Sequence, residues 1–308
     1  MPAATLGVLT WNLFHGRAGL PGLGPTRASR WRGRPVDDGV HMHVNLKLTG
    51  LMADRIRAWA PDVCALQEVP TAAMGEIVAR TGMVAVGTTT GPLIGPRRLR
   101  DALAARNPDL WLTHEGNANL LLLGPALALV PGSERAVRLN PVGDILRAAL
   151  RLRLDAGELL RYLPEPRRAV LARARTAGGA EVALACVHCH NARRPELIAM
   201  ELARATAALE AVAGGSPMIL AGDLNAPPPH PAVAALARAG WSGAPAPPGV
   251  GIDRVLSRGL EVVEPERALP ASEREAGVRW RGLSRRVRLS DHDPVVAAFR
   301  VSGSRAAR

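Results

Sequence analysis

The sequence predicts a mixed α/β fold in which two β-sheets pack face to face and helices cover their outer sides. Strand-length apolar segments alternate with helix-spaced segments, and they fall into two comparable halves. Six polar motifs also follow apolar runs, in this order: Thr10-Trp11-Asn12, Gln67-Glu68-Val69, Val187-His188, Gly222-Asp223-Leu224-Asn225, Ile252-Asp253-Arg254 and Ser290-Asp291-His292-Asp293-Pro294. Because loops at strand ends carry function, we expect all six motifs at one rim of the two sheets.

The first half of the chain is expected to supply strands and helices in alternation. The strands are expected at residues 6–13, 63–69, 83–87 and 120–123, and the helices at residues 46–59 and 72–81. Leu48, Leu51 and Met52 recur at helical spacing, and this first helix stops before Pro61. The Gly-, Pro- and Arg-rich stretch at 16–39 has the turn signals of a long surface loop.

The second half continues the alternation. Strands are expected at residues 169–175, 181–188, 217–221, 252–257, 260–264 and 295–301, and helices at residues 195–213 and 231–239. Gly178-Gly179 predicts a hairpin between the first two strands. We interpret residues 141–166 as an insertion with two short helices. The chain is then one domain, 1–301, followed by a frayed tail at 302–308.

The charge of the chain favours a polyanionic partner. Its net charge is +12, and of its 39 basic residues only Lys47 is a lysine. Such a surplus suits nucleic acid, anionic lipid headgroups or phosphorylated small molecules, although most of these arginines are expected to solvate helix faces. Aromatic residues make up 3% of the chain, which leaves few side chains for base stacking and favours small molecules or lipids.

The cysteine content and the hydropathy of the chain predict a soluble cytoplasmic protein. Three cysteines are too few and odd in number for a disulfide framework. The first residues lack the charged and apolar regions of a signal peptide, and the longest apolar run, 120–130, is too short to span a bilayer. We expect a monomer without membrane insertion.

Carboxylates, amides and imidazoles dominate the six motifs, and together they suit a hard metal site with an acid/base pair beside it. Glu68 follows the apolar run 63–67, where a carboxylate is costly unless it binds a cation or several donors. A solvated strand end is the alternative. Asp223 and Asn225 would share one face of an extended segment, or form an Asx-turn instead.

His292 is expected at the mouth of the strand that Pro294 starts, where an imidazole can bind phosphate or act as a base. Asp253 is a candidate to orient His292 by accepting its ring N–H. Alternatively, Arg254 makes Asp253 half of a structural ion pair.

The run Cys186-Val187-His188-Cys189-His190 matches the attachment pattern of c-type haem. We reject haem because strand alternation places Cys186 and Cys189 on opposite faces, whereas attachment needs both thiols on one side. A zinc site made of Cys186, His188 and His190 is a stronger competitor, but it lacks a fourth ligand. His15 lies close enough to Asn12 in sequence to touch a substrate.

From Leu9 to Val296 the chain resembles the endonuclease/exonuclease/phosphatase superfamily, which includes deoxyribonucleases, abasic-site endonucleases, inositol-polyphosphate 5-phosphatases and bacterial sphingomyelinases. The segments that match, in family order, are Leu9-Thr10-Trp11-Asn12, Leu66-Gln67-Glu68, Gly116-Asn117-Ala118-Asn119-Leu120, Val187-His188, Gly222-Asp223-Leu224-Asn225 and Ser290-Asp291-His292-Asp293-Pro294. The resemblance implies a four-layer α/β sandwich and a metal site in which Glu68 is the principal ligand, assisted by Asn12 and Asp291.

The resemblance also implies roles around the phosphate. Asp223 would orient or deprotonate the attacking water, and Asn225 would bind a phosphoryl oxygen. His292, held by Asp253, would contact the scissile phosphate, and His188 would stabilise or protonate the leaving oxygen. Whether Asp223 or His292 is the base stays open.

We therefore expect a phosphoesterase that uses Mg²⁺ or Mn²⁺ and hydrolyses a phosphodiester or phosphomonoester by attack of activated water. Asn117 and Asn119 are candidate substrate-binding residues. A DNA endonuclease or exonuclease is the alternative, with nucleic acid as the partner. A catalytically silent binding module of the same fold is the rival from another class.

Overall fold

The computed structural model describes residues 4–18, 36–37, 40–43, 45–90, 95–106, 118–163, 166–243 and 246–301. The predicted tail at 302–308, most of the predicted loop at 16–39 and Asn117 lie outside these ranges. Within the described residues, no helix is long and apolar enough to cross a membrane.

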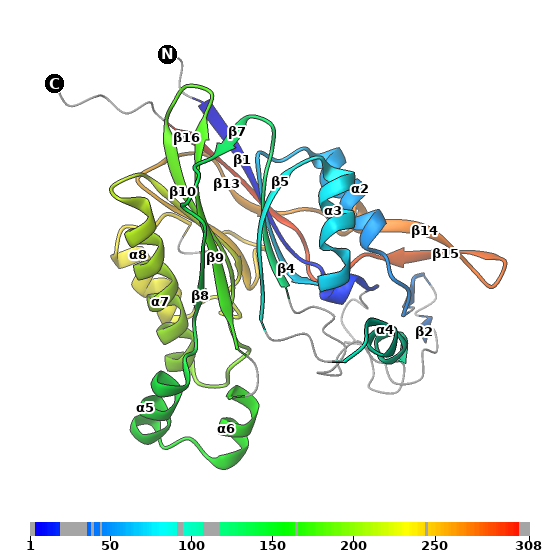
Figure 1. Cartoon of the computed structure of the whole chain (residues 1–308), viewed down its shortest axis with the longest axis horizontal. Helices are drawn as coiled ribbons and strands as arrows, with labels where there is room; N and C mark the ends of the chain where they lie inside the picture. The colour runs from blue at the N-terminus through cyan, green and yellow to red at the C-terminus, as the bar shows by residue number, and fades with distance from the viewer. Residues whose placement is uncertain are drawn as a thin grey trace.

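The first sheet has six strands in the order β13-β16-β1-β4-β6-β5 (Figure 1). Their bounds are β1 (Ala4–Asn12), β4 (Val63–Val69), β5 (Val84–Thr89), β6 (Ala118–Leu123), β13 (Glu261–Ala268) and β16 (Val295–Val301). β1 runs parallel to β4 and antiparallel to β16. The end of β1 therefore lies beside the end of β4 and the start of β16.

The second sheet has the order β12-β11-β10-β9-β7, and β8 also pairs with β9. Its strands are β7 (Leu127–Leu129), β8 (Arg135–Arg138), β9 (Arg168–Thr176), β10 (Glu181–His188), β11 (Met218–Asp223) and β12 (Asp253–Arg258). β9 and β10 form the antiparallel hairpin predicted at Gly178-Gly179. β10 runs parallel to β11, so their carboxyl ends share one rim.

Helices cover the outer face of each sheet, which confirms the predicted architecture (Figure 1). The helices are α2 (Thr49–Trp59), α3 (Met74–Thr81), α4 (Arg97–Arg106), α5 (Val142–Leu152), α6 (Ala156–Tyr162), α7 (Pro195–Ala213) and α8 (Pro231–Arg238). α2 and α3 pack on the first sheet, and α7 and α8 pack on the second. A third apolar cluster fills the space between the sheets.

Strand alternation produces these three apolar layers. In β1, Leu6 and Val8 face the opposite sheet, whereas Leu9 and Trp11 face the helices. In β10, Cys186 faces the opposite sheet and Cys189, just after the strand, belongs to the layer beneath α7. The two thiols therefore lie in different layers, as strand alternation predicts, and could not both attach to one haem.

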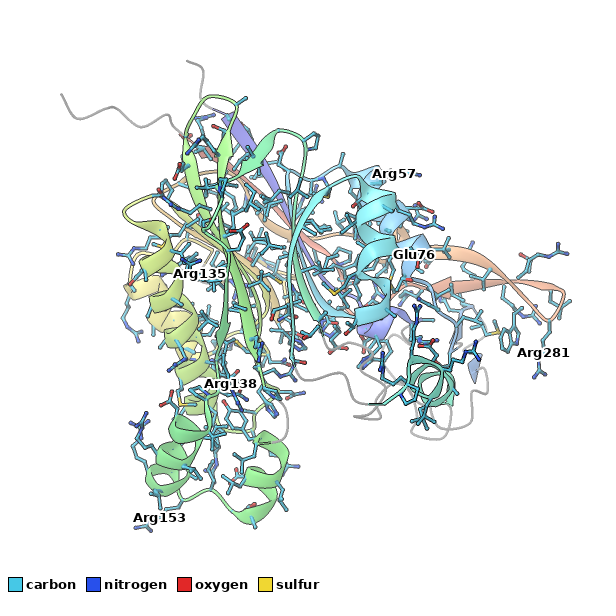
Figure 2. The ribbon with its side chains drawn as sticks, viewed as in Figure 1. Arg57, Glu76, Arg135, Arg138, Arg153 and Arg281 are labelled. Atoms are coloured by element: carbon cyan, nitrogen blue, oxygen red, sulfur yellow. The ribbon has the colours of Figure 1, made fainter. Side chains whose placement is uncertain are left out.

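An arm formed by β14 (Glu275–Trp280) and β15 (Leu283–Arg288) projects from the body beside α2 (Figure 1). The sequence interpretation did not include this hairpin, although Ala276, Val278 and Trp280 alternate along β14 and pack, partly buried, against the apolar layer beneath α2. Figure 2 shows Arg281 near the tip of the arm. The small strands β2 (Val36–Asp37) and β3 (Met42–His43) form a separate ladder.

Candidate functional site

Three predicted site residues of the second sheet lie side by side on neighbouring strands. His188 of β10 lies opposite Asp223 of β11, and Asp223 lies opposite Asp253 of β12. Gly222 permits this close pairing, since its φ is +152° and an added Cβ would lie 1.9 Å from the carbonyl oxygen of Val187. The second sheet therefore presents an imidazole and two carboxylates in one row.

Asn12 joins the two sheets at this row. It is fully buried at the end of β1. Its Nδ2 donates to Asp223 Oδ2 of the second sheet at 3.0 Å and to Glu68 Oε1 at 3.2 Å. Its Oδ1 accepts the backbone N–H of Phe14 at 3.0 Å. The amide is thus fixed between the two carboxylates.

A β-bulge aims Glu68 into the site. The β4–β6 register shifts between Leu66 and Val69, and Glu68 has φ +51°. Regular alternation would place Glu68 on the helix-covered face with Cys64 and Leu66. The bulge turns its carboxylate toward Asn12 instead, while Val69 takes its place in the apolar layer.

His292 and Asp253 form a short hydrogen-bonded pair between the two sheets. His292 Nδ1 lies 2.6 Å from Asp253 Oδ2. Burial would lower the pKa of His292, but the negative charges of Asp253, Asp223 and Asp291 outweigh burial and raise the pKa to about 11. His292 is therefore an imidazolium at neutral pH. Arg254 pairs instead with buried Glu266, which removes the structural alternative for Asp253.

Ser290 holds the closing motif against β1. Its Oγ donates to the carbonyl oxygen of Asn12 at 2.6 Å and accepts the backbone N–H of His292 at 3.1 Å. Trp11 Nε1 donates to the carbonyl oxygen of His292 at 3.1 Å. These contacts fix the position of His292, and Asp291 Oδ1 lies 3.9 Å from His292 Nε2.

Asp223 is buried and accepts hydrogen bonds at both oxygens. Burial and the charge of Asp253 raise its pKa to about 7, against the opposing effect of His292. The prediction of an extended Asp223–Asn225 pair is wrong, because Asn225 has φ +48° and its backbone N–H donates to Asp223 Oδ1 at 2.9 Å. This is the alternative Asx-turn. Asn225 Nδ2 donates to the carbonyl oxygen of Cys189 at 2.8 Å.

His188 lies between Glu68 and Asp223. Its Nε2 is 3.8 Å from Glu68 Oε1 and 3.6 Å from Asp223 Oδ2. Burial, followed by the positive charges of Arg167 and His292, lowers the pKa of His188 well below its usual value. The imidazole is therefore neutral.

Arg167, which no sequence motif indicated, and His15, which was expected only to be near enough to Asn12 to touch a substrate, both lie at the site. Arg167 is buried, and its guanidinium lies 2.9 Å from Nδ1 and 3.0 Å from Nε2 of His188. Its backbone N–H donates to Asn140 Oδ1 at 2.8 Å. His15 Nε2 lies 3.3 Å from Glu68 Oε2. His15 stands three residues after Asn12 in the sequence, and this closeness was the available signal.

The structure also places two other predicted features: Asn119 stands in β6 opposite the bulge that holds Glu68, and Cys186 and His190 flank His188 in and after β10. Asn119 is buried, and its side chain donates to the carbonyl oxygen of Arg168 at 2.7 Å, which holds the start of β9. The Cys186 thiol packs between the sheets against Gln67 Nε2 at 3.4 Å. His190 packs against the ring of Tyr162 instead. The structure thus gives no support to a zinc site that combines Cys186, His188 and His190.

The sequence pattern of the endonuclease/exonuclease/phosphatase family matches residues 9–292, a span that contains every residue of the site. The chain belongs to this family. The assignment confirms the resemblance seen in the sequence, and family members are hydrolases that act on phosphoester bonds. No curated protein matches the chain in sequence.

Solved structures of the endonuclease/exonuclease/phosphatase family share the fold. A family protein from Bacteroides thetaiotaomicron is 13% identical with a TM-score of 0.65, over 98% of this chain and 100% of that chain. A mannosyl-6-phosphatase from Bacteroides thetaiotaomicron VPI-5482 is 13% identical with a TM-score of 0.61, over 96% and 99% of the two chains. The human Nocturnin catalytic domain with bound sulfate is 14% identical with a TM-score of 0.60, over 97% and 98%.

Proteins of the endonuclease/exonuclease/phosphatase family typically depend on a divalent cation, and the donor set here fits one. Glu68 Oε2 is buried and accepts no hydrogen bond from the described residues, although His15 lies nearby. Carboxylate oxygens from Glu68 and Asp291 suit a hard cation, whereas Asn12 Oδ1 already accepts the N–H of Phe14 and its Nδ2 faces Glu68. Asp223, Asp253 and His292 also have potential ligand atoms within 4.8 Å of one another, but His292 Nδ1 already pairs with Asp253 Oδ2 at 2.6 Å.

Proposed function

We propose that the protein is a metal-dependent phosphoesterase that hydrolyses a P–O bond by attack of activated water. The observation that carries this proposal is the contact between polar side chains at the strand ends of the two sheets. Asn12 and Glu68 come from one sheet, and His188, Asp223 and Asp253 come from the other. Together with the His292 imidazolium, which is paired with Asp253, these residues combine cation ligands, a base and a cationic phosphate-binding group in one place.

We assign the proton transfer from water to Asp223. A carboxyl with a pKa near 7 is a far better proton acceptor at neutral pH than an ordinary aspartate. His292 is already protonated and cannot serve as the base. Its imidazolium instead suits the negative charge that builds on the non-bridging phosphoryl oxygens.

Asn225 and His188 are assigned to the remaining oxygens. Asn225 uses one amide N–H on the carbonyl of Cys189, which leaves the second N–H to donate to a phosphoryl oxygen. His188 is neutral and fixed by Arg167, so it suits a hydrogen bond to the leaving oxygen. Both assignments follow from the fixed position of each side chain beside Asp223.

We assign the cation to the carboxylates of Glu68 and Asp291, with Mg²⁺ or Mn²⁺ as the ion, and Asn12 assists by holding Glu68 Oε1 with its Nδ2. When bound, the cation would neutralise charge on the phosphoryl group and stabilise the leaving oxygen. Glu68 Oε2 supports this assignment: it is buried, accepts no hydrogen bond within the described part of the chain and has His15 Nε2 at 3.3 Å, and a buried carboxylate oxygen is stabilised by a cation.

A substrate panel tests the reaction class. The wild-type chain is assayed with MgCl₂ or MnCl₂, and with EDTA as the control, on bis-p-nitrophenyl phosphate, inositol phosphates, sphingomyelin, RNA, plasmid DNA and abasic DNA. We expect metal-dependent release of product from at least one phosphate ester and none with EDTA. Absence of hydrolysis across the panel, or full activity with EDTA, would contradict the proposal.

A nuclease is the second candidate, and the arm of β14 and β15 favours it. The arm carries five arginines: Arg279, Arg281, Arg285, Arg286 and Arg288. Arginine side chains on a projecting hairpin suit the phosphates of a polyanion. In the panel, cleavage of DNA or RNA without cleavage of the small esters would select the nuclease.

A further inference from the structure

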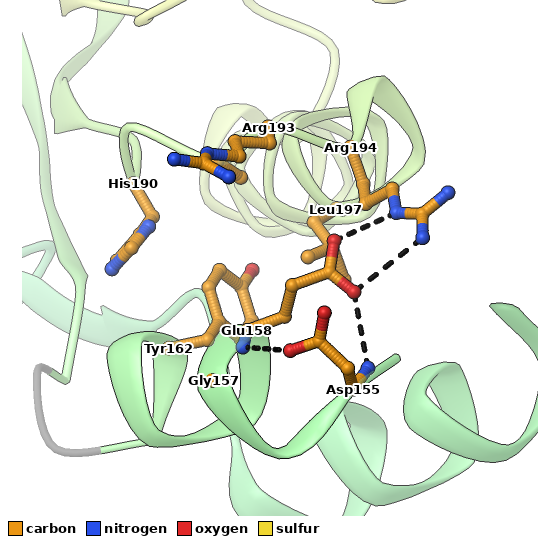
Figure 3. A pocket seen from close by; sticks show the side chains of 9 residues that line it. Asp155, Gly157, Glu158, Tyr162, His190, Arg193, Arg194 and Leu197 are labelled. Atoms are coloured by element: carbon orange, nitrogen blue, oxygen red, sulfur yellow. Dashed lines mark hydrogen bonds and ion pairs between the residues drawn. The ribbon is translucent and has the colours of Figure 1, made fainter. Parts of the chain in front are cut away.

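A pocket of about 230 Å³ lies where α6 faces the loop after β10 and the first turn of α7 (Figure 3). This volume is below the range of roughly 300–1,000 Å³ that is usual for complete small-molecule sites. The pocket therefore suits part of a ligand, and the rest of that ligand would lie outside it.

The pocket adjoins the catalytic row. Its His190 follows His188, the last residue of β10, by two positions. Between them, the carbonyl oxygen of Cys189 accepts the Asn225 amide at 2.8 Å. One short segment thus forms a pocket wall and supports the proposed phosphoryl-binding side chain. Besides burial and Arg167, the charge of His190 contributes to the lowered pKa of His188.

The floor of the pocket is preformed. Tyr162 OH donates to Glu201 Oε1 at 2.6 Å, and Glu201 Oε2 accepts the backbone N–H of His190 at 2.7 Å. Glu201 is fully buried, and the rings of Tyr162 and His190 meet edge to face with centroids 4.7 Å apart. Leu197 adds an apolar surface. A ligand would meet fixed aromatic and apolar surfaces without a cost for ordering them.

The acidic side chains of the pocket already have partners. Glu158 pairs with Arg194 at 2.8 Å and forms a capping box with Asp155 at the start of α6. Arg193 is exposed and makes no ion pair or hydrogen bond with the described residues, although its charge helps to lower the pKa of Glu158 after the contacts of Glu158 with Arg194 and Asp155. Figure 3 shows Arg193 on the His190 side of the pocket, while Arg194 reaches toward Glu158. Arg193 is thus the guanidinium left to bind an anion.

We propose that this pocket is a substrate subsite that binds a second phosphate, carried on a ring-sized group beyond the scissile phosphate. The ring would lie at the mouth of the pocket beside Ala192, above the buried Tyr162 and Leu197, and Arg193 would pair with the second phosphate, a geometry that guanidinium favours. The substrate is then a small molecule with two phosphate groups. This inference rests on the proposed phosphoesterase function, because it places the scissile phosphate at Asn225 and His292.

Calorimetric binding without turnover tests the subsite. The Asp223→Asn protein is titrated, with MgCl₂ present, with glucose 1,6-bisphosphate and with glucose 6-phosphate. We expect the bisphosphate to bind about tenfold more tightly, the value of one charge-assisted contact. Adding Arg193→Met should reduce this preference to about onefold. Arg238→Met, a control at an exposed arginine at the end of α8, should keep the preference.

Three results would overturn the subsite: equal affinities in the parent protein, a preference that survives Arg193→Met, or Arg193-dependent binding of a single-stranded oligonucleotide but not of the bisphosphate. Failure of the proposed function gives a different result. In that case, the wild-type chain fails to hydrolyse any ester of the panel, while the Arg193-dependent binding preference is still measured.

Discussion

His292 Nδ1 lies 2.6 Å from Asp253 Oδ2, and this contact crosses from one sheet to the other. His292 precedes β16 of the first sheet, and Asp253 begins β12 of the second. Asn12 makes a second crossing contact to Asp223. The candidate site therefore forms only when the two sheets pack together, which couples the chemistry of the site to the core between them.

Asp253→Asn should reduce turnover by about 10²–10⁴-fold, because an amide can still accept the ring N–H but no longer supplies the charge that stabilises the imidazolium. The measurement is kcat on the best substrate of the panel, with circular dichroism to verify the fold. Asp54→Asn is the matched control, since Asp54 is partly exposed on α2 and pairs with Arg80 at 3.0 Å. Equal kcat for Asp253→Asn and the wild type would refute the role of Asp253.

Glu68→Gln should weaken binding of Mg²⁺ and Mn²⁺ by about 100-fold or more, because it removes the charge of the principal proposed ligand. Calorimetric titration of the metal-free chain with each chloride salt measures this directly, without any substrate. Glu76→Gln on α3 is the control, as Glu76 lies on the surface (Figure 2). Unchanged metal affinity in Glu68→Gln would show that the cation binds elsewhere.

Arg167→Met should lower kcat by about 10–100-fold, with Arg167→Lys retaining part of the activity, because the guanidinium fixes His188. If His188 assists the leaving oxygen, the loss should be larger for an alkyl ester than for a p-nitrophenyl ester, which needs less assistance. An equal loss on both esters would indicate that Arg167 only supports the fold.

Glu266→Ala should destabilise the chain by about 3–5 kcal/mol, because it leaves the guanidinium of fully buried Arg254 without its carboxylate. Glu210→Ala, which breaks the exposed pair with Arg258, should cost at most about 1 kcal/mol. Urea unfolding followed by circular dichroism compares the two variants. Similar urea-unfolding midpoints for the two variants would contradict the claim that the buried ion pair contributes more stability than the exposed one.

Much of the architecture could be predicted because the spacing of apolar residues indicates which face of a helix or strand is buried. The hairpin of β9 and β10 and the helix at 195–213 match the predicted positions. The described side chains of α4, at 97–103, are mostly exposed, so no apolar stripe marks that helix. The arm at 275–288 was not predicted although Ala276, Val278 and Trp280 alternate, because these side chains are only partly buried and the run is short.

The candidate site could be predicted as a set of residues, but its geometry depends on tertiary structure. Glu68 adopts a positive φ that its residue type does not favour, whereas Asn225 does so in the Asx-turn that the sequence offered as an alternative. Arg167 was missed because nothing in its local sequence distinguishes it among 39 basic residues. Only the fold places its guanidinium against His188.

The most direct test of the central claim compares metal-dependent turnover of one cleaved substrate by the wild type and by Glu68→Ala, Asp223→Asn and His292→Ala. Each variant removes a different proposed function: cation binding, proton transfer from water, or charge on the phosphate. We predict that each loses turnover by about 10²-fold or more while its circular dichroism spectrum stays that of the wild type. Wild-type turnover in all three would contradict the site assigned here.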